Sequence, residues 1–229
     1  GYIVIAVYLL VNSLFMWIFP GEWNIFDSGY AGLDTLFFLS PWIFLFLVPA
    51  VTMRMIAEEK RLGTIELIFS RPITERGIIW GKYLASVVLV LFALLPGIIY
   101  YLSVFMLGEV PGNLDKGGTL GAYIGLFFLA SIYASAGIFA SSLTDNQVIA
   151  FIIAVFICFV MFMGFDSLAY LPGLKHFDET IIRLGINEHY KSMSRGVLDI
   201  RDIAYFIAVV ILFNESTRIV LLSRQWKRS

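Results

Sequence analysis

Six apolar runs divide the chain, and each is close to the length that crosses a bilayer. They cover residues 2–19, 36–56, 78–107, 120–143, 148–165 and 203–222. A spanning helix needs about 20 apolar residues to cross roughly 30 Å of hydrocarbon. Because 59% of the residues are hydrophobic, only 14% are charged and the mean hydropathy is +0.86, the sequence predicts an all-α polytopic membrane protein. We expect six transmembrane helices in one domain over residues 1–229.

Several other classes of function lack the residues they need. The formal net charge of -1 argues against nucleic acid as a partner, because that surface has to be basic. Cys158 is the single cysteine and lies in an apolar run, so we expect a small buried residue rather than a disulfide or a metal ligand. The nearest match to a phosphate-binding loop, at residues 77–83, has the wrong spacing and no Ser or Thr after its lysine. We therefore expect no catalytic residue, no metal and no cofactor in this chain.

An acidic pair invites one comparison with an enzyme. Glu58 and Glu59 resemble the start of the EExxxR motif of intramembrane prenyl-protein proteases, but glycine stands at Gly63 in place of the arginine. The two histidines, His176 and His189, fall in a loop that we place on the opposite side of the membrane from this pair. A joint metal site is therefore not expected.

Charges concentrate in residues 57–77, between the second and third apolar runs. A charge at the bilayer centre costs roughly 2.5–3.5 kcal/mol, so this segment must lie in water or at the interface. The positive-inside rule places it on the cytoplasmic side together with both termini. Ten of the 16 Lys and Arg residues then face the cytoplasm: Arg54, Lys60, Arg61, Arg71, Arg76 and Lys82 around the segment, and Arg218, Arg224, Lys227 and Arg228 near the C-terminus.

The pattern inside this segment predicts an amphipathic helix over residues 58–69. Such a helix can lie along the membrane or fit a groove on a partner. The pair Arg71–Pro72 ends the helix, because a proline crowds the residue before it, and Thr74 is the expected cap of the next helix. Periodicity alone favours a solvated, interfacial connector with ordinary caps over a partner-binding helix. The apolar stripe of the helix consists of Leu62, Ile65 and Phe69.

Small residues fill the fourth run, and a carboxylate interrupts the sixth. Small side chains let helices approach closely, so we expect the fourth run to pack most tightly. A pathway lined by Ser131, Ser135 and Gly137 is the alternative. A carboxylate at membrane depth is a functional candidate by default, but Glu215 has Arg218 one turn further on, which favours a local ion pair.

The remaining features concern breaks and ends. Pro96–Gly97 predicts a break in the long third run.

The loop over residues 166–202 is expected on the outer side, with short interfacial helices around Ile181, Ile182, Leu184 and Ile186. The chain starts without Met and without a basic flank, so we expect that part of the natural N-terminus is missing.

The run EEKRLGTIELIFSRPITERGIIWGKYLA, at residues 58–85, resembles a segment of type-2 ABC transporter permeases: an EE-x-R-x-GT-x-E stretch, an R-P turn and a G-K-Y helix start. A second stretch, HYKSMSRGVLDIRDIAYF at residues 189–206, resembles the loop and last span of the same family. With residues 1–19 included, the chain is most similar to the permease subgroup associated with bacterial gliding motility.

The resemblance implies a permease subunit, an exporter of the bacterial cytoplasmic membrane. It implies two protein partners, a cytosolic ABC ATPase that binds MgATP and a second permease subunit, in addition to membrane lipid. Two alternatives stay open: an ATP-independent channel or secondary carrier that uses Glu215 and the small residues of the fourth run, and a membrane scaffold. The resemblance assigns the family's ATPase-coupling role to the matching positions of this sequence. These are Glu58, Glu59, Lys60, Arg61, Gly63, Thr64, Glu66 and Arg71.

Overall fold

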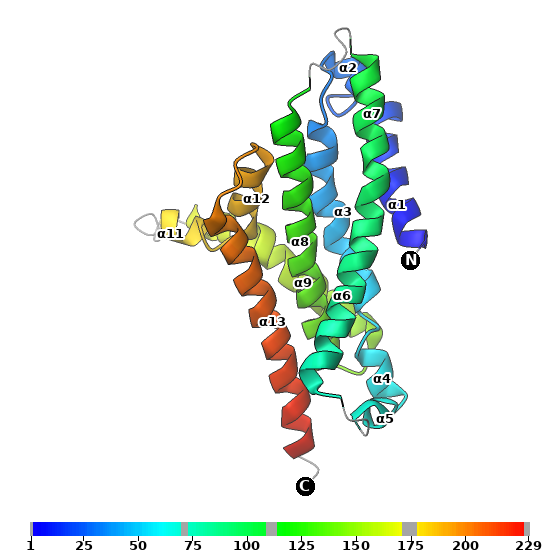
Figure 1. The fold of residues 1–229 in the computed structure, drawn as a ribbon, viewed down its shortest axis with the longest axis vertical. Helices are drawn as coiled ribbons and strands as arrows, with labels where there is room; N and C mark the ends of the chain where they lie inside the picture. The colour runs from blue at the N-terminus through cyan, green and yellow to red at the C-terminus, as the bar shows by residue number, and fades with distance from the viewer. Residues whose placement is uncertain (1, 70–72, 109–113, 171–177, 227–229) are drawn as a thin grey trace.

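A computed structural model describes residues 2–69, 73–108, 114–170 and 178–226. These residues form helices joined by turns, with no strand among them, in an elongated bundle (Figure 1). The helices are α1 (Tyr2–Ser13), α2 (Ile25–Ser28), α3 (Asp34–Thr52), α4 (Ala57–Arg61), α5 (Ile65–Phe69), α6 (Glu75–Leu94), α7 (Ile98–Leu107), α8 (Lys116–Leu143), α9 (Gln147–Phe159), α10 (Phe165–Ala169), α11 (Asp178–Ile182), α12 (Ile186–Ser194) and α13 (Ile200–Trp226), with π-turns η1 (Leu14–Ile18) and η3 (Val160–Gly164) and a 3-10 turn η2 (Leu95–Gly97).

Five helical stretches are long and apolar enough to cross a membrane. They are Asp34–Arg61, Glu75–Leu107, Lys116–Leu143, Gln147–Ala169 and Ile200–Ser223. The first apolar run forms a shorter helix, Tyr2–Ile18. The predicted all-helical, multi-span class is therefore confirmed for the described residues, with five of the six runs long enough by this measure.

Helix α8 lies at the centre of the bundle, with α3, α6, α12 and α13 around it (Figure 1). In its most apolar stretch, 78% of the residues are buried, against 22–44% in the other four long helices. The small residues make this possible, because a Cβ added at Gly137 would overlap the Thr52 hydroxyl of α3. The expectation that the fourth run packs most tightly is confirmed.

The expected break in the third run is also present. Pro96 lies in η2, between α6 and α7, and the Tyr123 hydroxyl of α8 donates a hydrogen bond to the Gly97 carbonyl oxygen at 2.7 Å. A Cβ at Gly97 would lie 3.3 Å from that hydroxyl, so a side chain there would crowd the contact. At the other end of α6, the Thr74 hydroxyl accepts a hydrogen bond from the Gly77 amide at 3.2 Å and caps the helix, as predicted.

The single amphipathic helix predicted over residues 58–69 is wrong. The structure has two short helices, α4 and α5, separated at residues 62–64. Gly63 has a φ of +71°, a left-handed conformation that glycine adopts without a steric penalty and that ends α4. Four basic or His positions named in the sequence analysis lie outside the described residues, namely Arg71, His176, Lys227 and Arg228. The side chains of Phe69 and Arg224 are likewise not described.

Short helices occupy the loop between the last two long helices, as expected, although their place at a membrane interface stays a prediction. In Figure 1, α11 projects from the bundle while α12 runs beside α8. A Cβ at Gly121 would overlap the Met193 carbonyl oxygen, and one at Gly125 would lie 3.1 Å from the Tyr190 ring. Helix α12 is therefore antiparallel to α8 and packs directly on its glycines.

Candidate functional site

The loop between α3 and α6, which carries the predicted coupling residues, is fastened to α6 by a lysine. The Lys82 ammonium contacts the Glu59 carboxylate at 2.5 Å and donates a hydrogen bond to the Met55 carbonyl oxygen at 2.7 Å. The two charged side chains are only 19% and 26% exposed. An ion pair shielded in this way is screened less by salt than a surface pair, so it holds α4 against α6.

A serine fastens the same loop to α8. The Ser141 hydroxyl accepts hydrogen bonds from the amides of Ile56, at 3.0 Å, and Ala57, at 2.9 Å, and donates one to the Met53 carbonyl oxygen at 2.9 Å. Ser141, Ile56 and Ala57 are all buried. One side chain therefore satisfies the backbone groups that the break between α3 and α4 leaves without helical partners. The ammonium of Lys60 adds a hydrogen bond to the carbonyl oxygen of the residue after Ser141.

The outward face of the loop is what a partner could reach. We name it the inner tip and define it as Glu58, Arg61, Leu62 and Gly63. Glu58 and Arg61 form a loose pair at 4.0 Å, and their side chains are 39% and 59% exposed. Leu62 is 62% exposed. The inner tip therefore combines two solvated charges with an exposed apolar side chain, a combination that suits a protein contact.

The predicted coupling residues therefore divide into two groups. Glu59 and Lys60 face the bundle, and the Thr64 hydroxyl donates to the Glu59 carbonyl oxygen at 3.3 Å, which folds the chain back after α4. Glu58, Arg61 and Gly63 belong to the inner tip. Glu66 is exposed in α5, and Arg71 lies outside the described residues.

Glu215 joins two helices. The expected pair with Arg218 is present, with Nη1 of Arg218 3.3 Å from the carboxylate. A second arginine, Arg76 at the start of α6, places its Nε 3.0 Å from the same carboxylate. Two positive charges therefore compensate Glu215, and the geometry favours a link between α6 and α13 over an ion-carrying carboxylate.

The residues of the suggested pathway pack rather than line an opening. The hydroxyls of Ser131 and Ser135 donate to the carbonyl oxygens of Phe127, at 2.7 Å, and Ile132, at 2.8 Å, in their own helix. Both serines are at most 5% exposed. Gly137 is the close contact to α3 described above. These three positions therefore support the packing interpretation of the fourth run.

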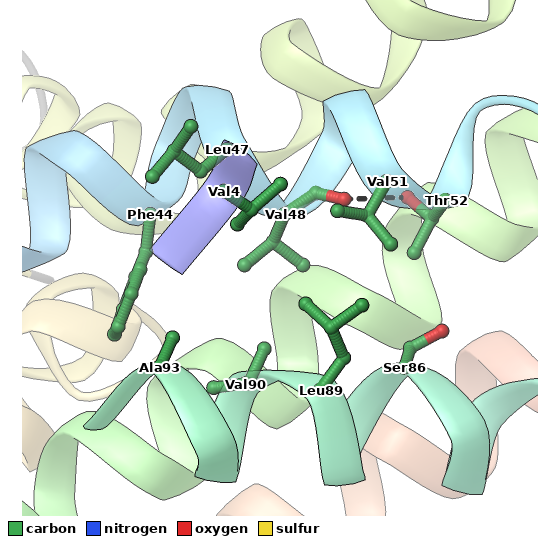
Figure 2. A pocket seen from close by; sticks show the side chains of 10 residues that line it. All are labelled: Val4, Phe44, Leu47, Val48, Val51, Thr52, Ser86, Leu89, Val90 and Ala93. Atoms are coloured by element: carbon green, nitrogen blue, oxygen red, sulfur yellow. Dashed lines mark hydrogen bonds between the residues drawn. The ribbon is translucent and has the colours of Figure 1, made fainter. Parts of the chain in front are cut away.

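An apolar crevice between α1, α3 and α6 offers no polar path either (Figure 2). Its free space is about 10 Å³, which is the room that one water molecule needs. The two hydroxyls at its edge donate to carbonyl oxygens in their own helices. Thr52 donates to Val48 at 3.0 Å (Figure 2), and Ser86 donates to Lys82 at 2.9 Å. Both hydroxyls already have an acceptor, so the crevice has nothing to hold a polar solute.

The identity of the chain follows from one comparison. A family model described as ABC-2 family transporter protein matches residues 4–215, which is most of the chain. The chain belongs to the ABC-2 transporter family. It is therefore a multi-pass transmembrane subunit of an ABC transporter, and the family normally pairs with a separate ABC ATPase. Comparison with curated proteins finds no match.

Sequence reasoning missed three contacts of this ABC-2 subunit. Lys82 stood among the basic residues of the segment, but nothing in the sequence linked it to Glu59, 23 positions earlier. Ser141 was one of many small residues in the fourth run, and Arg76 was counted only for orientation. The available signal for Lys82 was a lysine one turn inside an apolar helix, which needs a partner to remain charged there.

Proposed function

We propose that this ABC-2 subunit converts ATP hydrolysis by its partner ATPase into movement of the transmembrane bundle through the inner tip. The observation that carries the proposal is the double attachment of the loop: Glu59 to Lys82 on α6, and the α3–α4 turn to Ser141 on α8. A force on α4 then acts on α3, α6 and α8 together. MgATP binds to the partner, and this chain contributes no catalytic residue.

The proposal includes an orientation. Six spans with both termini in the cytoplasm place the inner tip beside the ATPase and put ten of the 16 basic residues on that side, in a bacterial cytoplasmic membrane. A second permease subunit, identical or different, completes the pathway, since the described part of one subunit offers no polar path at the two places considered above. If an impermeant reagent outside intact cells modified a Thr64→Cys variant, the segment would face outward and the proposed orientation would be refuted.

We further propose export, in service of gliding motility or other cell-surface machinery. The support for this is the resemblance of residues 1–19 and 189–206 to the gliding-motility subgroup. The ion pair of Glu59 with Lys82 bears on coupling and not on the substrate.

The test separates binding of the ATPase from the transmission of its movement to the transmembrane helices. Arg61→Glu and Leu62→Asp, on the inner tip, are expected to lower co-purification of the ATPase at least fivefold, because they reverse a charge and remove an exposed apolar contact. Glu59→Gln is expected to leave co-purification within twofold and to lower transport-coupled ATPase activity in proteoliposomes, because it weakens only the inward clamp.

Arg183→Glu is the matched control, because Arg183 is an exposed, ion-paired arginine directly after α11. Helix α11 lies away from α4 and α5 (Figure 1). It is expected to alter neither measurement. The ATPase is identified beforehand by mass spectrometry of the complex from native membranes. Undiminished co-purification with both inner-tip variants would refute the docking part of the proposal.

A further inference from the structure

A second pocket lies at the other end of the bundle, away from the loop between α3 and α6. It occupies about 640 Å³ between the first turns of α3, the η3–α10 segment and α12. This volume is typical of sites for small organic ligands. Part of its wall is aromatic and includes Phe37, Phe38, Trp42 and Phe162.

One end of the pocket is charged. The Asp166 carboxylate accepts a hydrogen bond from the Asn187 side chain at 2.7 Å through Oδ2, whereas its Oδ1 is buried and has no hydrogen-bond partner. The Lys191 ammonium is 3.7 Å from the same carboxylate, too far for a hydrogen bond, and its side chain is 49% exposed. Asp34 also lines the pocket. The pocket therefore presents two carboxylates and one ammonium, whereas Oδ1 of Asp166 is not accessible from it.

The aromatic wall is rigid where it meets α12. The Tyr190 hydroxyl donates a hydrogen bond to the Phe37 carbonyl oxygen at 2.7 Å, and burial raises the pKa of the Tyr190 phenol well above its usual range, so it remains a neutral donor. Because Tyr190 also packs on Gly125 of α8, the pocket is held by three helices and does not need a ligand to form.

The pocket has the depth of a lipid headgroup. From Asp34 to Trp42 the lining residues of α3 descend about 12 Å at 1.5 Å per residue, with the charge at the helix end and the aromatic rings below it. The interfacial layer of a bilayer is several ångströms thick on each side of the hydrocarbon. If the loop over residues 166–202 lies at the outer membrane surface, as the sequence predicts, the charged end meets headgroups and the aromatic side chains meet the first acyl carbons.

We propose that this pocket binds a membrane phospholipid with a primary ammonium group, of the phosphatidylethanolamine type. Lys191 contacts the phosphate, and the lipid ammonium donates hydrogen bonds to the accessible carboxylate oxygens of Asp34 and Asp166. A trimethylammonium headgroup has no N–H to donate, and an anionic headgroup without an amine leaves Lys191 as the single positive charge among the phosphate and the carboxylates of Asp34 and Asp166. The proposal goes beyond the transport cycle and does not depend on the partner ATPase.

The test uses the fluorescence of Trp42 in the full chain. The other tryptophans, Trp17, Trp23, Trp80 and Trp226, are replaced by Phe, and the purified protein in detergent receives phospholipids with brominated acyl chains, which quench a neighbouring indole. Phosphatidylethanolamine is expected to quench at a mole fraction at least threefold lower than phosphatidylcholine or phosphatidylglycerol with the same acyl chains.

Two variants and a control assign the effect. Asp166→Asn is expected to reduce the preference for phosphatidylethanolamine to less than twofold, and Lys191→Gln to weaken all three lipids. Glu188→Gln, on the same helix but outside the pocket lining, should change neither. Equal quenching by the three lipids, or an unchanged preference in Asp166→Asn, would overturn the proposal. The comparison of the three lipids uses a protein with unsubstituted pocket residues. It therefore tests the proposed preference even if a pocket variant fails to fold.

Discussion

The Ser141 hydroxyl supports the sharpest prediction about stability. Ser141→Ala removes one oxygen and leaves the buried amides of Ile56 and Ala57 without their only described acceptor. A buried donor left unsatisfied costs about 1–3 kcal/mol, so the two together predict a loss of about 2–6 kcal/mol, since neither group can reach solvent where it lies. We add no free-energy cost for a cavity, because alanine retains the Cβ of serine and only the hydroxyl oxygen is lost.

The next residue provides the control. Ser142 is also fully buried in α8, but its hydroxyl only donates to the Phe139 carbonyl oxygen of its own helix, at 2.7 Å. That carbonyl belongs to the helix ladder, so Ser142→Ala is expected to cost less than about 1 kcal/mol. Lys60 bonds the backbone oxygen of Ser142, so this contact survives the substitution.

Thermal unfolding in detergent measures the difference in stability, and hydrogen–deuterium exchange locates it. Ser141→Ala should lower the unfolding temperature clearly more than Ser142→Ala and should accelerate exchange at the amides of residues 56 and 57. If the two variants unfold at the same temperature and exchange alike over these residues, the bridge has no energetic role and the reasoning fails.

Two further predictions concern other helix contacts. Gly121→Ala should disrupt the packing of α12 on α8, because the new Cβ overlaps the Met193 carbonyl oxygen, whereas Gly81→Ala meets nothing within 4 Å and should be neutral or stabilising. Limited proteolysis of the loop before α13 would detect the first effect, and equal cleavage of the two variants would contradict it. Glu215→Gln should barely change the unfolding temperature, because its link to Arg76 is substantially exposed, while amide exchange at the start of α6 should rise; strong destabilisation would show that the link matters more than its exposure indicates.

Local signals carried much of the fold. Apolar length identified the long helices, Pro96 marked the break in the third run, and Thr74 marked a helix start, because each acts through its own backbone or its nearest neighbours. The amphipathic stripe over residues 58–69 was a weaker signal. It ignored Gly63, whose left-handed conformation divides the helix, and apolar spacing alone does not register a helix stop.

The functional contacts were harder to predict because they join residues far apart in the chain. Ser141 differs from Ser131 and Ser135 only in what lies opposite to it, and a sequence pattern does not contain that information. Glu59 likewise looked equivalent to Glu58, although the structure turns the first towards Lys82 and the second towards solvent. Charge patterns located the polar loop between α3 and α6 but did not say which of its charges face inward.

Helix α8 touches both ends of the molecule. Its glycines pack against α12 near one end of the bundle, and Ser141 binds the α3–α4 turn near the other. At 1.5 Å per residue, its 28 residues extend over about 42 Å. One continuous buried helix therefore connects the α3–α4 turn to the elements that surround the aromatic pocket, with no loop between them.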